Sequence, residues 1–298
     1  MNNLFQRTSS HWVRYSAYEL KKAWDGKEYI TPAPKARPAV YDPLKDAEAM
    51  VLDALNAGML QMNRKGADKV RAAVMDFVCK YGLLGFMTAL PTTPNFMDHD
   101  AVYLPKNHFI RDESMQVTEY AMQFFPFNKP DFHKSKDGLI WNINNDIEMM
   151  AISMAFGGHP LAMNMSFQRE YAESYDWLAQ QFKDWAFTFT SSFLYYEDRD
   201  RLDEATLDLY RKGMAAFGGI APTYHIVLLD KPTIVWDFHS LLLGVQMMFS
   251  FMLTDEAKPL RCCKQCVKAF AAAHPGAVFC SPRCKNQFNV YKSRAKKQ

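Results

Sequence analysis

The cysteines near the C-terminus constrain the fold of this chain more than any other feature. Five of the six cysteines lie between positions 262 and 284. Cys263 and Cys266 form a C-x2-C pair, and Cys280 and Cys284 form a C-x3-C pair. Six cysteines in 298 residues are too few for a disulfide-stapled fold, and cysteine pairs at this spacing are typical of a metal site. The pattern predicts a C-terminal segment that folds around a metal ion.

Zinc is the metal that these ligands favour, because Zn²⁺ prefers tetrahedral coordination and thiolates suit it as ligands. The second pair is expected at the start of a helix, with Ser281 as the N-cap and Pro282 as the first helical residue. The positive end of such a helix also favours thiolates. Four thiolates leave no position open for a reacting water, so we expect a single structural Zn²⁺. Its expected ligands are Cys263, Cys266, Cys280 and Cys284.

Three other residues bear on this ligand set. Cys262 competes with Cys263, because it would form a C-x3-C pair with Cys266, and the sequence leaves this choice open. His274 could replace one cysteine, but it lies in mid-loop and four thiols already suffice. Cys79 lies on an expected apolar helix and is interpreted as a small core residue.

The C-terminal segment is also strongly basic. Residues 261–298 hold nine Lys and Arg residues and no Asp or Glu, although the whole chain has 35 basic and 32 acidic residues. This asymmetry suggests a polyanionic partner. A helix from Pro282 to about Lys296 would be two-faced, with an inner stripe of Cys284, Phe288, Tyr291 and Ala295.

Such a helix fits the major groove of DNA, where lysines hold phosphates and amide side chains read base edges. The same surface could instead follow RNA. The residues expected to contact nucleic acid are Arg283, Lys285, Asn286, Asn289, Lys292, Arg294 and Lys296. Two structural interpretations need no nucleic acid. The basic residues could only balance the net negative charge of four thiolates and Zn²⁺, or they could form a solvated helix end that the helix dipole favours.

The rest of the chain reads as a mainly helical body. Periodic apolar residues predict helices over 44–62, 67–81, 167–193, 203–217 and 239–255, a short helix over 113–125, and a β-hairpin over 224–238. The predicted fold class is α+β, with a predominantly helical body over 1–258 and a C-terminal treble-clef zinc finger over 259–298.

Motifs for catalysis are absent from the sequence. There is no phosphate-binding loop, dinucleotide fingerprint, zinc-protease motif or nucleophile elbow. Asp98-His99-Asp100 is the remaining candidate for a catalytic site, and a lone tripeptide is weak evidence, so we expect no enzyme.

The N-terminus lacks the apolar region of a signal peptide, and the apolar stretch 241–253 is too short to span a bilayer. We therefore expect a cytoplasmic protein without a membrane partner.

The C-terminal segment resembles a known family at these residues. Cys263, Cys266 and Phe270 form C-x2-C-x3-F, and Phe279-Cys280-Ser281, Cys284 and a basic helix follow. This order is similar to a CGNR-type zinc finger, although Cys-Gly-Asn-Arg is here Cys284-Lys285-Asn286-Gln287. Such fingers close bacterial proteins with a larger N-terminal domain called ABATE, which are thought to be transcriptional regulators. The resemblance covers only 261–298.

Together these patterns predict a zinc-binding protein that contacts duplex DNA through its basic C-terminal helix, with transcription regulation as the role. The body would sense a small-molecule effector or form a homo-oligomer. The alternative is a protein-interaction or structural protein in which zinc only stabilises the C-terminus.

Overall fold

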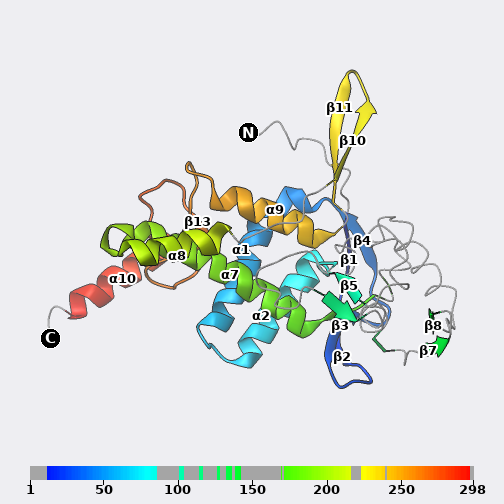
Figure 1. The fold of residues 1–298 in the computed structure, drawn as a ribbon. Helices are drawn as coiled ribbons and strands as arrows, with labels where there is room; N and C mark the ends of the chain where they lie inside the picture. The colour runs from blue at the N-terminus through cyan, green and yellow to red at the C-terminus, as the bar shows by residue number, and fades with distance from the viewer. Residues whose placement is uncertain are drawn as a thin grey trace. The chain divides into compact units, whose positions relative to one another are not determined.

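The computed structural model describes residues 12–85, 101–103, 114–116, 126–127, 132–135, 138–141, 169, 171–215, 223–238 and 240–295. Figure 1 labels the helices and strands of the fold. The chain divides into two compact units that each draw on three stretches of sequence. The first unit comprises Met1–Lys45, Met75–Leu178 and Gly218–Gly244, and the second comprises Asp46–Val74, Ala179–Phe217 and Val245–Gln298.

The first unit contains short antiparallel strands. They are β1 (Trp12–Tyr15), β2 (Tyr18–Lys22), β3 (Glu28–Pro32), β4 (Pro38–Tyr41), β5 (Ala101–Tyr103), β6 (Ser114–Gln116), β7 (Phe132–Ser135), β8 (Gly138–Trp141), β9 (Glu173–Ser174), β10 (Thr223–Leu228) and β11 (Pro232–Asp237). Strand β1 pairs with β4, and β2, β3 and β9 form a three-stranded sheet. Strands β5 with β6, β7 with β8, and β10 with β11 form three further pairs.

A buried carboxylate organises the first unit. Glu173 is 3% exposed, and it accepts hydrogen bonds from the backbone N–H groups of Leu84 and Gly85 and from the hydroxyl of Tyr171. Burying a charge is costly unless hydrogen bonds satisfy it, and these three donors do so. Trp12 of β1 donates its indole N–H to the carbonyl of Leu83 at 3.0 Å. This bond holds the same chain segment whose Leu84 and Gly85 N–H groups bind Glu173.

The second unit is mainly helical. It holds α1 (Ala47–Met62), α8 (Glu204–Ala215) and α10 (Pro282–Ala295), the first half of α2 (Ala67–Tyr81), and most of α7 (Tyr175–Asp198) and α9 (Leu241–Leu253). It also holds the short strands β12 (Leu260–Cys262) and β13 (Ala269–Ala271). The 3-10 helices η1 (Pro43–Asp46) and η4 (Arg199–Arg201) precede α1 and follow α7 along the chain.

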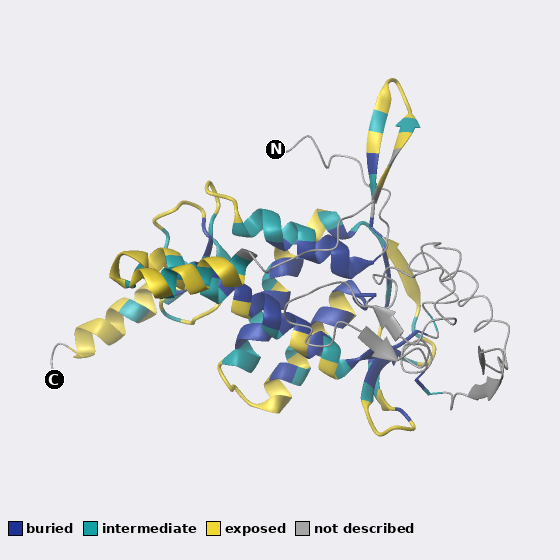
Figure 2. Cartoon of the chain, in the orientation of Figure 1, coloured by how far each residue is buried: buried dark blue, intermediate teal, exposed yellow. Residues whose placement is uncertain are grey.

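Helices α1 and α7 make a close contact in the core of the second unit. Gly58 of α1 lies against the backbone of Phe182, so that a Cβ atom built on the glycine would be 1.9 Å from the Phe182 carbonyl oxygen. Phe182, Trp185 and Phe189 on α7 are almost completely buried, and the first two stack at 6.0 Å. Figure 2 shows this core in dark blue along α7. The absence of a side chain at position 58 allows the two helices to approach closely.

Most of the expected elements are confirmed. The helix over 67–81, the hairpin over 224–238 and the Asp203 N-cap are present, and the Asp203 carboxylate accepts a 2.8 Å bond from the Thr206 N–H. The described chain combines helices with short strands, as an α+β class requires. No helix in the described ranges is long and apolar enough to cross a membrane.

Three expectations were wrong. The helix predicted over 167–193 begins only at Tyr175, because Glu173 and Ser174 pair with β3. A strand, β6, occupies Ser114–Gln116 where a short helix was expected. Cys79, expected in the core, is exposed on α2.

Candidate metal centre

A β-hairpin and the start of a helix position the cysteine pairs. Strands β12 and β13 pair antiparallel, and the turn between them carries Cys263 and Cys266. The Cys263 N–H donates to the Lys268 carbonyl at 2.9 Å, and the Val267 N–H donates to the Cys263 carbonyl at 2.9 Å. This turn requires a left-handed backbone at Val267, with φ +62°, which is unusual for a β-branched residue.

The second pair lies at the N-terminus of α10. Ser281 accepts a hydrogen bond from the Cys284 N–H on its hydroxyl at 3.2 Å, as expected of an N-cap, and Pro282 is the first helical residue. The Cys280 N–H donates to the Cys263 sulfur at 3.4 Å. The local sequence thus brings the helix start against the turn of the hairpin.

The four sulfur atoms form one compact group. The Sγ atoms of Cys263, Cys266, Cys280 and Cys284 all lie within 4.8 Å of one another. Cys280 Sγ is 3.6 Å from the sulfurs of both Cys266 and Cys284, which is too long for a disulfide. A tetrahedral site with metal–sulfur bonds of about 2.3 Å has sulfur–sulfur edges of about 3.8 Å. The group therefore fits one tetrahedral metal ion, and its donor set suits zinc.

The thiols of this group differ in their acidity. Burial opposes ionisation of Cys263, but hydrogen bonds from the backbone N–H groups of Cys266, Cys280 and Gln265 outweigh it and lower the thiol pKa to about 6. Burial, reinforced by the neighbouring thiols, raises the pKa of Cys280 to about 12, and burial also raises the pKa of Cys266. A divalent cation would stabilise the thiolate forms, so metal binding here would release protons.

Neither alternative ligand joins the group. Cys262 is not among the four clustered cysteines; its sulfur is 4.0 Å from the Val267 carbonyl oxygen, and burial raises its thiol pKa to about 11. His274 is also outside the cluster and uses its backbone carbonyl to accept a hydrogen bond from Ala277 at 3.0 Å.

Two contacts attach the hairpin to the helices of the second unit. Asn56 on α1 donates its side-chain amide to the Ala269 carbonyl at 3.2 Å and accepts the Ala269 N–H at 2.9 Å. The amide thus pairs with β13 as a neighbouring strand would. Arg261 donates to the Glu197 carboxylate at 3.0 Å and to the Pro275 carbonyl at 3.2 Å. Neither residue was predicted from the sequence, although Asn56 is a polar residue between Leu55 and Ala57 in an expected apolar helix.

Helix α10 is more exposed than its sequence pattern predicted. Cys284 and Phe288 are half-buried, and the Phe288 ring lies 5.2 Å from that of Phe279. Tyr291 is 51% exposed and Ala295 is also exposed, so the predicted inner stripe covers only the first two turns. Figure 2 shows the rest of α10 exposed. The C-terminal turns therefore present side chains to solvent on every face.

Within the described part of the chain, the cationic side chains of α10 have no acidic partners. Arg283, Lys285, Lys292 and Arg294 are exposed, and the described residues form no ion pair with them. Asn286 and Asn289 are exposed on the same helix, and Lys264 and Lys268 add two exposed charges on the hairpin. Lys296 and the Asp98-His99-Asp100 tripeptide lie outside the described residues.

Comparison of the chain with protein-family models, with curated proteins and with solved structures found no match. The geometry of the site is thus the basis for assigning a function.

Proposed function

We propose that this protein binds one structural Zn²⁺ through Cys263, Cys266, Cys280 and Cys284 and uses the adjacent helix α10 to bind nucleic acid. Residues 259–298 would form a treble-clef zinc finger of CGNR-like type, in which a hairpin turn and a helix start each supply two ligands. Duplex DNA is the proposed partner and transcription regulation the proposed role.

The proposal depends on the positive charge of α10, for which the described residues supply no acidic partner. A helix without acidic neighbours repels its own basic side chains, and its exposed turns have no packing to stabilise them. A polyanion would remove both costs, because phosphates would bind the cationic side chains and release their counterions. Nucleic acid is the polyanion that also suits the exposed amides, since asparagine can pair with base edges.

A structural role for zinc is the second candidate. The Asn56 and Arg261 contacts attach the hairpin to α1 and α7, as expected of a metal-stapled end that stabilises the second unit. In that case the basic residues would only offset the charge of the four thiolates, which with Zn²⁺ carry about −2.

Fluorescence anisotropy of a labelled DNA duplex across a salt series distinguishes the two candidates. The samples are the zinc-loaded wild type, the double variant Lys285→Gln/Lys292→Gln, and a control with the same loss of charge, Lys65→Gln/Lys69→Gln. The control lysines are exposed residues of the same unit.

Each lost phosphate contact flattens the log–log salt slope by about 0.9, so the α10 variant should lose about 1.8 and the control should match the wild type. Equal slopes for all three proteins would remove Lys285 and Lys292 of α10 as the contact, and no binding at low salt would remove nucleic acid as the partner and leave the structural role. A single-stranded RNA competitor in the same assay separates DNA from RNA.

A further inference from the structure

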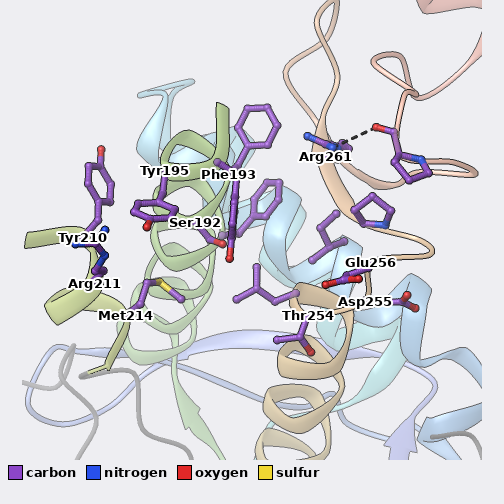
Figure 3. A pocket seen from close by; sticks show the side chains of 16 residues that line it. Ser192, Phe193, Tyr195, Tyr210, Arg211, Met214, Thr254, Asp255, Glu256 and Arg261 are labelled. Atoms are coloured by element: carbon purple, nitrogen blue, oxygen red, sulfur yellow. Dashed lines mark hydrogen bonds between the residues drawn. The ribbon is translucent and has the colours of Figure 1, made fainter. Parts of the chain in front are cut away.

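A cavity of about 760 Å³ lies within the second unit, and none of the four clustered cysteines lines it. Its walls come from the end of α7, from α8, from the segment that joins α9 to β12, and from β12 itself with Pro275 (Figure 3). This volume falls in the usual range for sites that hold small molecules, which is roughly 300–1,000 Å³. Neither the four clustered cysteines nor any residue of α10 lines the cavity.

Aromatic rings form much of the cavity wall. Phe193, Tyr195 and Tyr196 lie at the end of α7, and Tyr210 lies on α8. Tyr195 contacts the rings of both Tyr196 and Tyr210, with centroids 5.2 Å and 6.1 Å apart. Ring faces of this kind attract apolar bodies and cations.

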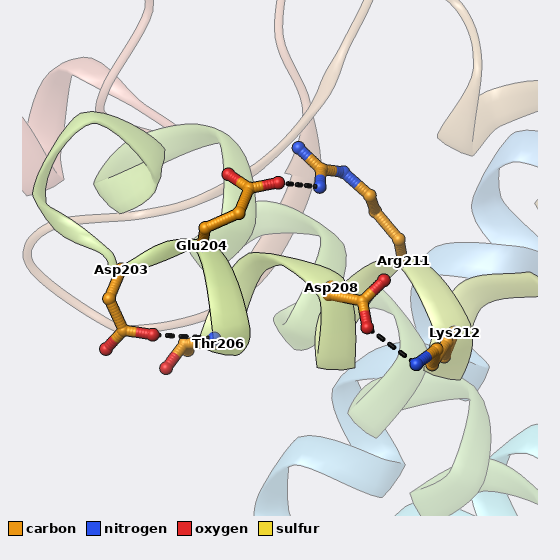
Figure 4. A network of polar contacts seen from close by, with 6 residues as sticks. All are labelled: Asp203, Glu204, Thr206, Asp208, Arg211 and Lys212. Carbon is orange, nitrogen blue, oxygen red and sulfur yellow. Dashed lines mark hydrogen bonds and ion pairs between the residues drawn. The ribbon is translucent and has the colours of Figure 1, made fainter.

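The two arginines that line the cavity are already neutralised. Arg211 donates to the Glu204 carboxylate at 2.7 Å, within the polar network on α8 that Figure 4 shows. Arg261 donates to the Glu197 carboxylate at 3.0 Å. Neither glutamate lines the cavity, so each arginine has its counter-charge without any ligand.

The remaining charge in the wall is negative. Asp255 and Glu256 line the cavity just after α9. The Asp255 carboxylate accepts backbone N–H groups from Ala257 and Lys258, whereas no described residue donates a hydrogen bond to the carboxylate of Glu256. In Figure 3 the Glu256 carboxylate faces the aromatic residues of α7 across the cavity.

We propose that this cavity binds a flat organic cation, with its apolar body against the tyrosine and phenylalanine rings and its positive charge beside Glu256. An anionic ligand would find both arginines occupied and a free carboxylate against it. A neutral ligand would gain no attraction from Glu256, whose exposed carboxylate is hydrated. The proposal is independent of nucleic-acid binding, because α10 is cationic and does not attract such a ligand.

Fluorescence titration with two dyes tests the site in the intact, zinc-loaded chain freed of nucleic acid. Proflavine is a tricyclic cation at neutral pH, and acridine has the same ring system without the charge. The variants are Glu256→Gln, Tyr196→Leu and the control Glu48→Gln, which changes an exposed acid on α1 outside the cavity. Tyr196 is 66% exposed, so its replacement leaves the core intact.

We expect proflavine to bind the wild type at least tenfold more tightly than acridine does. Glu256→Gln should weaken proflavine about fivefold, which corresponds to ~1 kcal/mol, and leave acridine unchanged. Tyr196→Leu should weaken proflavine several-fold, and Glu48→Gln should have no effect. Equal affinities for the two dyes, an unchanged proflavine affinity in Glu256→Gln, or no binding of either dye would overturn the proposal.

Discussion

Replacing Gly58 with alanine should destabilise the second unit, although alanine is the better helix former. The new Cβ would lie 1.9 Å from the Phe182 carbonyl oxygen and 2.8 Å from the Cβ of Ala186. Ordinary van der Waals contact requires about 3.5 Å, so α1 and α7 would have to separate by more than an ångström. The obstacle is backbone, which cannot turn aside as a flexible side chain can.

The expected cost follows from two opposing effects. Overpacking a core typically costs about 1–3 kcal/mol, and we expect a backbone clash to reach about 3–5 kcal/mol. The gain in helix propensity from glycine to alanine returns about 1 kcal/mol. The net loss for Gly58→Ala should therefore be about 2–4 kcal/mol.

Gly213 on α8 supplies the matched control, because a Cβ there meets no atom within 4 Å. Gly213→Ala should gain the helix propensity alone, about 0.5–1 kcal/mol. Urea unfolding of zinc-loaded protein, followed by far-UV circular dichroism, measures both changes. Equal stability of Gly58→Ala and wild type, or changes of the same sign in both variants, would refute the close α1–α7 contact.

Three further substitutions test local features of the second unit. Burial raises the pKa of Asp184 to about 6 from a usual 3.8, so the folded state holds this proton more tightly and stability falls as the pH rises from about 4 to 6. Asp184→Asn should remove that part of the pH dependence and be about 1–3 kcal/mol more stable than wild type at pH 7, as unfolding across a pH series would show. Val267→Gly should relieve the left-handed strain at φ +62° and raise the unfolding midpoint by the equivalent of about 1 kcal/mol; a lower midpoint would contradict this. Asn56→Ala should cost about 1–3 kcal/mol, because it leaves the Ala269 N–H and carbonyl without their partner, and faster hydrogen exchange at the Ala269 amide would report the loss directly.

The sequence predicted elements wherever the signal was local. The helix over 67–81 and the N-caps at Asp203 and Ser281 depend on residues a few positions apart, and the structure contains all three. The cysteine spacing likewise predicted which four sulfurs lie together, because hairpin turns and helix starts are local structures.

Features that depend on contacts between residues far apart in the chain could not be predicted from the sequence. Tyr171 and Tyr175 follow a helical period, but Glu173 between them is held in a strand by β3 and by donors at Leu84 and Gly85. Tertiary hydrogen bonds of this kind override local periodicity. The exposure of Tyr291 also escaped prediction, since an apolar stripe on a helix does not reveal where the facing surface ends.

The zinc content of the purified chain tests the central proposal most directly. Native mass spectrometry of the wild type, Cys262→Ser and Cys263→Ser counts the metal ions bound to each protein. We expect one zinc in the wild type and in Cys262→Ser, and its loss or marked weakening in Cys263→Ser, because Cys263 belongs to the group of four sulfurs and Cys262 does not. A wild type without zinc, or a chain that keeps zinc in Cys263→Ser and loses it in Cys262→Ser, would contradict the proposed centre.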